Sequence, residues 1–167
     1  MLLGIDLGGT KIEGIVLESK EKPIEVIRHR VDTEEKKGYL QVVDNIKSLV
    51  EYIENKINHK FDKLGIGTPG TLDPATGLLK NSNSQCLNGM PLKKDLSKTL
   101  DKSILIQNDA NCFALAETLL GSVNDQYPHA KNVFGIIIGT GVGGGIIING
   151  KTLYGSQGIG GEWGHTI

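Results

Sequence analysis

The sequence predicts an α/β protein, with a mixed sheet flanked by helices and the start of a second, duplicated lobe. Short apolar segments of strand length alternate with amphipathic segments of helix length. The first strand–loop–strand segment recurs near the end of the chain. Glycine, at 23 of 167 residues, is about twice as frequent as usual and is concentrated toward the end of the chain.

The strongest local signals lie in the first part of the chain. Apolar residues 2–5 lead into the glycine turn at 6–11, and apolar residues resume at 12–17, which indicates strand, turn and strand. Residues 23–31 alternate well enough to form a third strand. Residues 39–57 place apolar side chains at helical spacing with charges between them, which predicts an amphipathic helix.

Shorter elements follow. Residues 64–67 indicate a strand that breaks at Thr68-Pro69-Gly70, residues 92–100 a short helix, and residues 104–106 another strand.

A second helix is predicted at residues 110–120, capped by Asp109 and stopped by Gly121. Residues 122–132 are polar and are predicted to form a linker.

An internal repeat sets the predicted domain organisation. Residues 2–17 align without gaps to residues 133–148, with five of sixteen positions identical. We therefore predict an N-terminal α/β lobe at residues 1–125 and the truncated beginning of a second, C-terminal lobe at residues 126–167. Two comparable lobes need roughly 260 residues or more, so we expect the chain to be a fragment.

Composition excludes several classes of protein. The formal net charge is −1 and no basic run is present, which argues against a nucleic-acid partner. No apolar stretch approaches the roughly 20 residues of a membrane helix, and the N-terminus lacks the basic region of a signal peptide. Cys86 and Cys112 are too few for a disulfide framework and fit a cytoplasmic location.

Two phosphate-binding patterns match only formally. Residues 139–144 fit G-x-G-x-x-G, but a strand follows where the dinucleotide fold needs a helix. Residues 145–152 fit the P-loop pattern, but three consecutive isoleucines cannot form its flexible turn. We reject both interpretations.

The two similar hairpins with glycine-rich tips remain. The first tip carries Gly8, Gly9, Thr10 and Lys11, and the second carries Gly139, Thr140 and Gly141. Backbone N–H groups at such tips can surround an anion, and Thr and Lys side chains add donors. Two facing tips would bind a triphosphate from both lobes; the alternative is that both are merely tight turns.

Six motifs in this order resemble the ROK family of bacterial sugar kinases and repressors, which has the actin-like (ribonuclease H-like) ATPase fold. The motifs occupy residues 6–11, 65–70, 81–83, 108–112, 139–145 and 161–165. Residues 76–100 are most similar to the fructokinase/mannokinase branch, and N-acetylhexosamine kinases are nearly as similar.

The resemblance implies transfer of the ATP γ-phosphate to a hexose hydroxyl, which we expect to be C6 of fructose or mannose. An N-acetylhexosamine kinase or glucokinase is the alternative. A sugar-responsive repressor is less favoured, because no DNA-binding segment fits before Asp6 and Asp109 is retained.

The family pattern assigns roles residue by residue. Asp109 would be the catalytic base, and Asp6 would hold Mg²⁺ through water. The predicted sugar-binding residues are Gly70, Asn83, Asn108, Asp109, Glu162 and His165. From the residues alone, Asp109 could be a plain helix cap, Asn83 an ordinary turn residue and His165 a surface histidine.

His165 also matches a family zinc ligand, but one histidine cannot form a site of about four ligands. Zinc is therefore expected only in a full-length parent protein. We expect ATP and a hexose as ligands, a homodimer for that full-length protein, and no appreciable kinase activity for the 167-residue chain alone.

Overall fold

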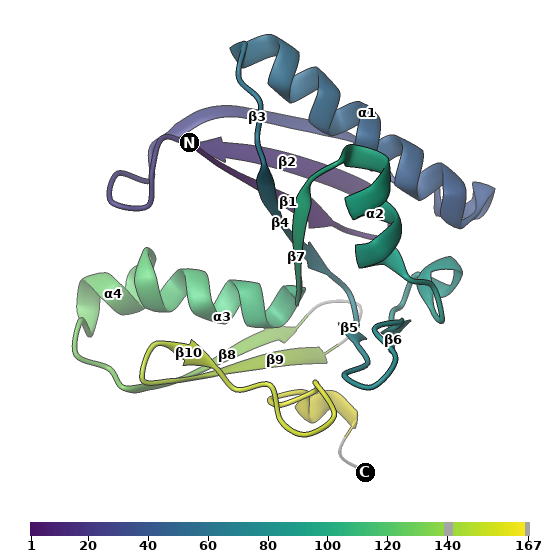
Figure 1. Ribbon diagram of the computed structural model, residues 1–167. Helices are drawn as coiled ribbons and strands as arrows, with labels where there is room; N and C mark the ends of the chain where they lie inside the picture. Colours follow the sequence, from purple (N-terminus) through teal and green to yellow (C-terminus); the bar gives the residue numbers. More distant parts are fainter. Residues whose placement is uncertain (139–141, 166–167) are drawn as a thin grey trace. The chain divides into compact units, whose positions relative to one another are not determined.

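The computed structural model describes residues 1–138 and 142–165. The chain divides into two compact units, Met1–Gln107 and Asn108–Ile167. Figure 1 shows the elements of both, and each unit is considered by itself.

A five-stranded mixed sheet forms the centre of the first unit, in the order β3-β2-β1-β4-β7. Its strands are β1 (Leu2–Leu7), β2 (Lys11–Leu17), β3 (Glu25–Asp32), β4 (Lys63–Thr68) and β7 (Ser103–Asn108). β1 pairs antiparallel with β2 and parallel with β4, so the sheet is mixed, as predicted. All five predicted strands are present, with small differences at their ends.

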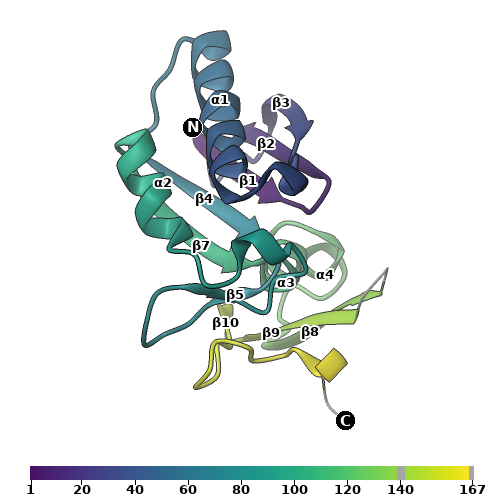
Figure 2. The same cartoon turned by 90° about the vertical axis from the view of Figure 1, so that its right-hand side faces the viewer.

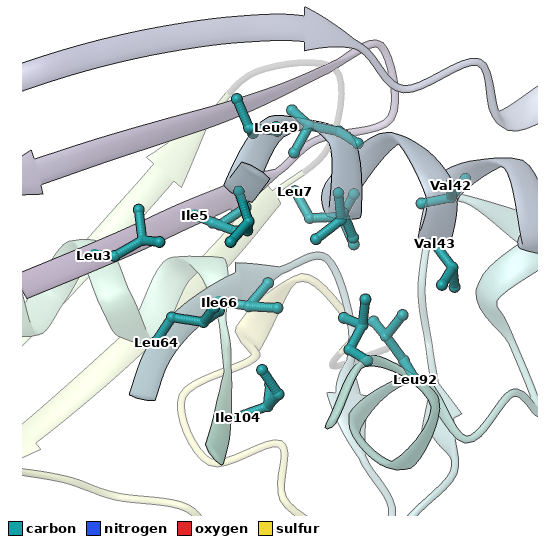
Figure 3. Packing of buried hydrophobic residues seen from close by; sticks show 14 of the residues in the cluster. Leu3, Ile5, Leu7, Val42, Val43, Leu49, Leu64, Ile66, Leu92 and Ile104 are labelled. Atoms are coloured by element: carbon teal, nitrogen blue, oxygen red, sulfur yellow. The ribbon is translucent and has the colours of Figure 1, made fainter. Parts of the chain in front are cut away.

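Two helices cover one face of this sheet, α1 (Tyr39–Ile57) and α2 (Leu92–Leu100) (Figures 1 and 2). Alternate residues of β1 point toward them, and the facing apolar positions of α1 and α2 complete the core (Figure 3). The Tyr39 hydroxyl of α1 donates to the Asp95 carboxylate of α2 at 2.7 Å, which ties the helices together.

Short elements follow β3 and connect β4 to α2. A two-stranded ribbon joins β5 (Thr71–Leu72) and β6 (Leu79–Lys80), and 3₁₀ turns lie at Glu35–Lys37 (η1) and Gln85–Leu87 (η2). These elements position the segments on which several predicted site residues lie.

The second unit begins with α3 (Asp109–Leu119) and α4 (Ser122–Gln126), followed by a three-stranded antiparallel sheet. Its strands are β8 (Asn132–Ile138), β9 (Val142–Ile148) and β10 (Lys151–Thr152), and the 3₁₀ turn η3 (Trp163–His165) follows. α3 packs directly on the β8–β9 hairpin, because a Cβ atom at Gly145 would lie only 2.6 Å from the Ala110 carbonyl oxygen.

Three predictions about this second unit need correction. The N-cap of α3 is Asn108, whose side-chain oxygen accepts from the Asn111 N–H at 3.1 Å, and Asp109 is the first helical residue. The helix ends at Leu119 rather than at residue 120. Residues 122–132 are not all linker, because the first of them form α4.

The start of α4 has a local cause. The Glu117 carboxylate accepts hydrogen bonds from the N–H and the hydroxyl of Ser122, at 3.0 and 2.7 Å, which satisfies a donor at the helix N-terminus.

The compact units divide before α3, whereas the predicted lobes divide after residue 125. The lobe boundary stays a prediction about a longer protein. In the described part of the chain, no helix combines the length and the apolar character needed to cross a bilayer.

Candidate active site

The glycine turn (residues 8–11) is fixed from the end of β3. The Gly8 N–H donates to the Lys11 carbonyl at 2.9 Å, which closes the turn. The Thr33 hydroxyl donates to the Gly8 carbonyl at 2.6 Å, and the Thr33 N–H donates to the Thr10 carbonyl at 2.9 Å. Thr33 is fully buried, whereas Gly9, Thr10 and Lys11 are exposed. The turn is therefore fixed by hydrogen bonds on its buried side and exposed to solvent on the other.

The charged side chains beside this turn interact with residues of the neighbouring strands. The Lys11 ammonium pairs with Asp32 on the neighbouring strand. Asp6 lies opposite Glu13 in the β1–β2 ladder, and burial, with a further contribution from Glu13, raises the pKa of Asp6 despite the opposing charge of Arg30. Burial and Glu13 thus disfavour the ionised form of Asp6, whereas a nearby cation would favour it.

Glu13 itself stays ionised through its partners. Burial alone would raise the pKa of Glu13, but hydrogen bonds from Arg30 and Arg28 outweigh burial and lower it. The Arg30 Nε lies 2.6 Å from a Glu13 carboxylate oxygen.

Gly70 lies against the segment that leads to Asn83. Its φ of +82° is in the left-handed region, and a Cβ atom there would lie 2.3 Å from the Lys80 carbonyl oxygen and 2.8 Å from the Ser82 nitrogen. Only glycine fits this position. Two predicted sugar-binding positions are thereby brought close together.

The asparagine loop (residues 81–84) is held by a side chain from outside it. Asn88 accepts from the Ser82 N–H and donates to the Ser82 carbonyl, both at 2.9 Å. Ser82 and Ser84 are buried, and Asn83 between them is exposed. The loop therefore directs Asn83 outward.

The glycine turn and the asparagine loop meet within the first unit. A Cβ atom at Gly9 would lie 3.3 Å from the Ser84 hydroxyl oxygen and 3.6 Å from Oε2 of Glu35. That Glu35 oxygen is buried and, within the described structure, has no hydrogen-bond partner. The predicted nucleotide-binding residues of the first tip therefore adjoin the predicted sugar loop.

A second cluster of predicted residues lies in the second unit. Asn108 caps α3, and Oδ1 of Asp109 accepts from the Ala110 N–H at 2.8 Å. A Cβ atom at Gly143 would lie 3.6 Å from the Ala110 Cβ and 3.9 Å from Oε2 of Glu162. The Glu162 carboxylate therefore lies near Ala110 in the first turn of α3, the helix that begins at the predicted base.

Several predicted residues lie outside the described part of the chain. These are Gly139, Thr140 and Gly141 of the second tip and the side chain of His165. Among the described residues, no group of three or more His, Cys, Asp or Glu side chains could hold a metal ion. The zinc assignment of His165 stays a prediction.

A groove of about 360 Å³ in the second unit contains none of the predicted residues. It lies between α3, α4 and β8, and its lining is Phe113, Ala114, Glu117, Ser122, Val123, Val133, Phe134, Gly135 and Ile136. The carboxylate in the groove, that of Glu117, already accepts hydrogen bonds from Ser122. The groove has no arrangement of groups for catalysis, so the candidate site residues are those of the two clusters, each described within its own unit.

Sequence reasoning missed Thr33, Ser84, Glu35 and Asn88. Thr33, Ser84 and Glu35 act through contact with the glycine turn, which is distant in sequence, and Asn88 acts on Ser82, six residues away. Ser84 and Asn88 lie within the family-like residues 76–100, but that resemblance assigned no role to either. Only Thr33 has a weak sequence signal for such a role, because it is a hydroxyl residue shortly after an alternating strand.

Comparison with known proteins gives consistent matches. A family model described as "ROK family" matches residues 2–167. An N-acetyl-D-glucosamine kinase of Mannheimia succiniciproducens is 42% identical over 165 residues, which are 99% of this chain and 52% of that protein. A ROK hexokinase from Thermus thermophilus matches with a TM-score of 0.81 and 30% identity, over 96% of this chain and 51% of that one.

A ROK family glucokinase from Streptomyces griseus, solved with glucose and AMPPNP, matches with a TM-score of 0.79 and 29% identity. The match covers 98% of this chain and 49% of that one. The chain spans about half the length of the curated relatives it matches. These neighbours have the actin-like ATPase fold, so the predicted fold class is confirmed.

Proposed function

Because the chain belongs to the ROK family, we propose that it forms the N-terminal half of an ATP-dependent sugar kinase. One observation carries the proposal: the glycine turn and the asparagine loop adjoin each other at Gly9 and Ser84. A kinase needs the phosphates and the acceptor sugar side by side, and these two loops supply donors of the right type for each.

The exposed glycine turn would bind the ATP phosphates. The N–H groups of Gly9 and Lys11, the Thr10 hydroxyl and the Lys11 ammonium are donors for phosphate oxygens, and Gly8 and Gly9 allow close approach. Asp6 would hold Mg²⁺ through water. When bound, Mg²⁺ would neutralise charge on the phosphates. Gly139, Thr140 and Gly141 are proposed to contribute the second set of donors.

The sugar would be bound by Gly70, Asn83, Asn108, Glu162 and His165. Asp109 would accept the proton of the reacting hydroxyl as its oxygen attacks the γ-phosphorus. The bond from that phosphorus to the bridging oxygen then breaks, and ADP leaves. Phosphoryl transfer depends mainly on positioning and charge neutralisation, so the proposed base need not be strong.

The names of relatives guide the choice of sugar. Several are N-acetyl-D-glucosamine kinases at 39–42% identity, and the ROK hexokinase and glucokinase match structurally. We propose N-acetylglucosamine as the first acceptor to test. Fructose and mannose, predicted from residues 76–100, are the next.

The test is ADP release by the longer protein, of about the relatives' length, that carries this chain. It would be assayed with N-acetylglucosamine, N-acetylmannosamine, glucose, mannose and fructose. Asp109→Asn should lower kcat by about 10²–10⁴-fold, because a general base is lost. Asp125→Asn on α4 is the matched control and should leave turnover unchanged. Undiminished turnover by Asp109→Asn would contradict the proposed base.

Three further proposals concern the 167-residue chain and the longer protein. The 167-residue chain alone should show no appreciable turnover, and robust activity from it would contradict a nucleotide cleft that needs both glycine tips. Zinc bound through His165 can be checked by metal analysis before and after chelation. A homodimer can be checked by sedimentation.

A further inference from the structure

We infer that two side chains outside the predicted site each position one substrate loop: Thr33 the glycine turn and Asn88 the asparagine loop. The inference rests on the proposed function, because it assigns ATP to the first loop and the sugar to the second. Neither residue would touch a substrate, so both are positioning residues.

Thr33 orients the donors of the glycine turn. Its hydroxyl and its N–H bind the carbonyls of Gly8 and Thr10, at 2.6 and 2.9 Å. In a planar trans peptide, the N–H points opposite to the C=O of the same unit. The N–H groups of Gly9 and Lys11 therefore point away from Thr33, on exposed residues. Thr33 fixes the direction in which these two N–H groups can meet an anion.

The Thr33 hydroxyl has a specific role in this arrangement. Thr33 is fully buried, so water does not compete for its hydroxyl. The bond links it to the Gly8 carbonyl, which is 25 residues away in the sequence. A valine would keep the shape and the backbone N–H but would leave the Gly8 carbonyl without this donor. The peptide between Gly8 and Gly9 could then rotate.

Asn88 holds the asparagine loop by a two-point contact. Its side-chain amide binds the N–H and the carbonyl of Ser82, both at 2.9 Å, as a neighbouring strand would. Its nitrogen also lies 3.3 Å from Oε1 of Gln85. This contact fixes the peptide groups on both sides of Ser82, and so the direction of Asn83. An aspartate at position 88 would keep the acceptor but would face the Ser82 carbonyl with a second oxygen.

Thr33 and Asn88 hold different loops, so a variant of each should affect a different KM. Thr33 follows β3, and Asn88 follows η2. In the longer protein, Thr33→Val should raise KM for ATP about three- to tenfold, the effect of one lost hydrogen bond, with KM for the sugar within twofold of wild type. Asn88→Asp should raise KM for the sugar by a similar factor and leave KM for ATP unchanged.

Conservative and remote variants separate positioning from stability. Thr33→Ser keeps the hydroxyl and should restore KM for ATP. Thr118→Val removes a hydroxyl bond of the same 2.6 Å length, to the Ala114 carbonyl of α3, and should change neither KM. Asn124→Asp, on the exposed face of α4, is the control for Asn88→Asp. If Thr33→Val does not fold, Thr33→Ala takes its place.

A binding measurement on the 167-residue chain makes the inference independent of turnover. In wild type, ADP should shift the amide resonances of Gly9 and Lys11, and Thr33→Val should weaken this binding about three- to tenfold. ADP binding at these amides without sugar phosphorylation would overturn the proposed function alone. The inference is overturned if ADP leaves both amides unshifted, if serine fails to restore binding, or if each variant raises both KM values equally.

Discussion

The β1–β2 and β8–β9 hairpins correspond in sequence but are packed differently. In the first unit, α1 covers the face that carries Leu3, Ile5 and Leu7, which are 1–4% exposed. In the second unit, the corresponding residues are Phe134, Ile136 and Ile138, which are 46–75% exposed. There α3 packs on the other face of β8.

The pairing register explains the difference. Gly4 pairs with Ile15, but the corresponding Gly135 pairs with Gly145 rather than with Ile146. A shift of one residue moves every side chain of one strand to the opposite face relative to its neighbour. The β8–β9 hairpin therefore gathers Gly135 and Gly145 on one face, where α3 can approach closely. A repeat detected by alignment thus specifies the strands without specifying the face that is buried.

The largest expected effect comes from truncating the same aligned position in both hairpins. Ile5→Ala removes a buried side chain beneath α1 and should destabilise the first unit by about 2–5 kcal/mol. Ile136→Ala removes a half-exposed side chain and should stay within about 1 kcal/mol. Amide hydrogen exchange, read separately for each unit, measures both. Equal losses would show that the two hairpins are packed alike.

Much of the fold could be predicted because local patterns determine it. The apolar spacing of residues 39–57 gave the bounds of α1, and the alternation of residues 2–17 gave β1 and β2. The same alternation in residues 133–148 could not show the register, because register depends on the turn and on the helix that packs there. The Asn108 cap was missed because Asn and Asp are nearly equal as caps, and only the backbone conformation distinguishes them.

The candidate site residues that lie within sequence motifs could be predicted. Gly70 and Asn83 came from separate motifs, and the structure brings their segments together. Thr33 and Asn88 could not be found this way, because their role lies in hydrogen bonds to backbone groups 25 and 6 residues away. Such contacts leave no spacing or composition signal.

A smaller effect on stability is expected at α1, the helix that packs on the β1–β2 hairpin. Glu54, near the end of α1 and 3% exposed, lies 2.8 Å from the Lys102 ammonium and 2.9 Å from the Lys60 ammonium, and accepts from the Phe61 N–H at 2.9 Å. Burial alone would raise the pKa of Glu54, but these partners outweigh it and lower the pKa. Because the folded pKa is below the unfolded value, this contribution is present above about pH 4.3 and is lost as pH falls through the folded pKa.

Glu54→Gln should therefore destabilise the first unit by about 1.5–3 kcal/mol at pH 7, the range for hydrogen bonds to charged groups. The difference from wild type should shrink as the pH falls below about 4. Denaturation at several pH values, followed by circular dichroism, measures it. Trp163 is the single tryptophan of the sequence and lies in the second unit, so its fluorescence should be unaffected. A constant difference across pH would contradict the assignment to Glu54 ionisation.

The smallest effect distinguishes how closely a helix approaches each hairpin. Gly14 and Gly145 are aligned, and a Cβ atom at either would meet a neighbour at 2.5 or 2.6 Å. At Gly14 that neighbour is the Cδ1 atom at the end of the Ile53 side chain, which can change rotamer. At Gly145 it is the Ala110 carbonyl oxygen, which cannot move without shifting α3.

Gly145→Ala should cost about 1–3 kcal/mol in the second unit, whereas Gly14→Ala should cost about 1 kcal/mol or less in the first. Gly65→Ala, where a Cβ atom would meet nothing within 4 Å, controls for the change of residue itself. Amide exchange of β9 and β2 measures the losses. Because α3 begins at Asp109, Gly145→Ala should also lower turnover of the longer protein, whereas Gly14→Ala should not. If Gly14→Ala proves the more damaging, the close approach of α3 is not what distinguishes the two hairpins.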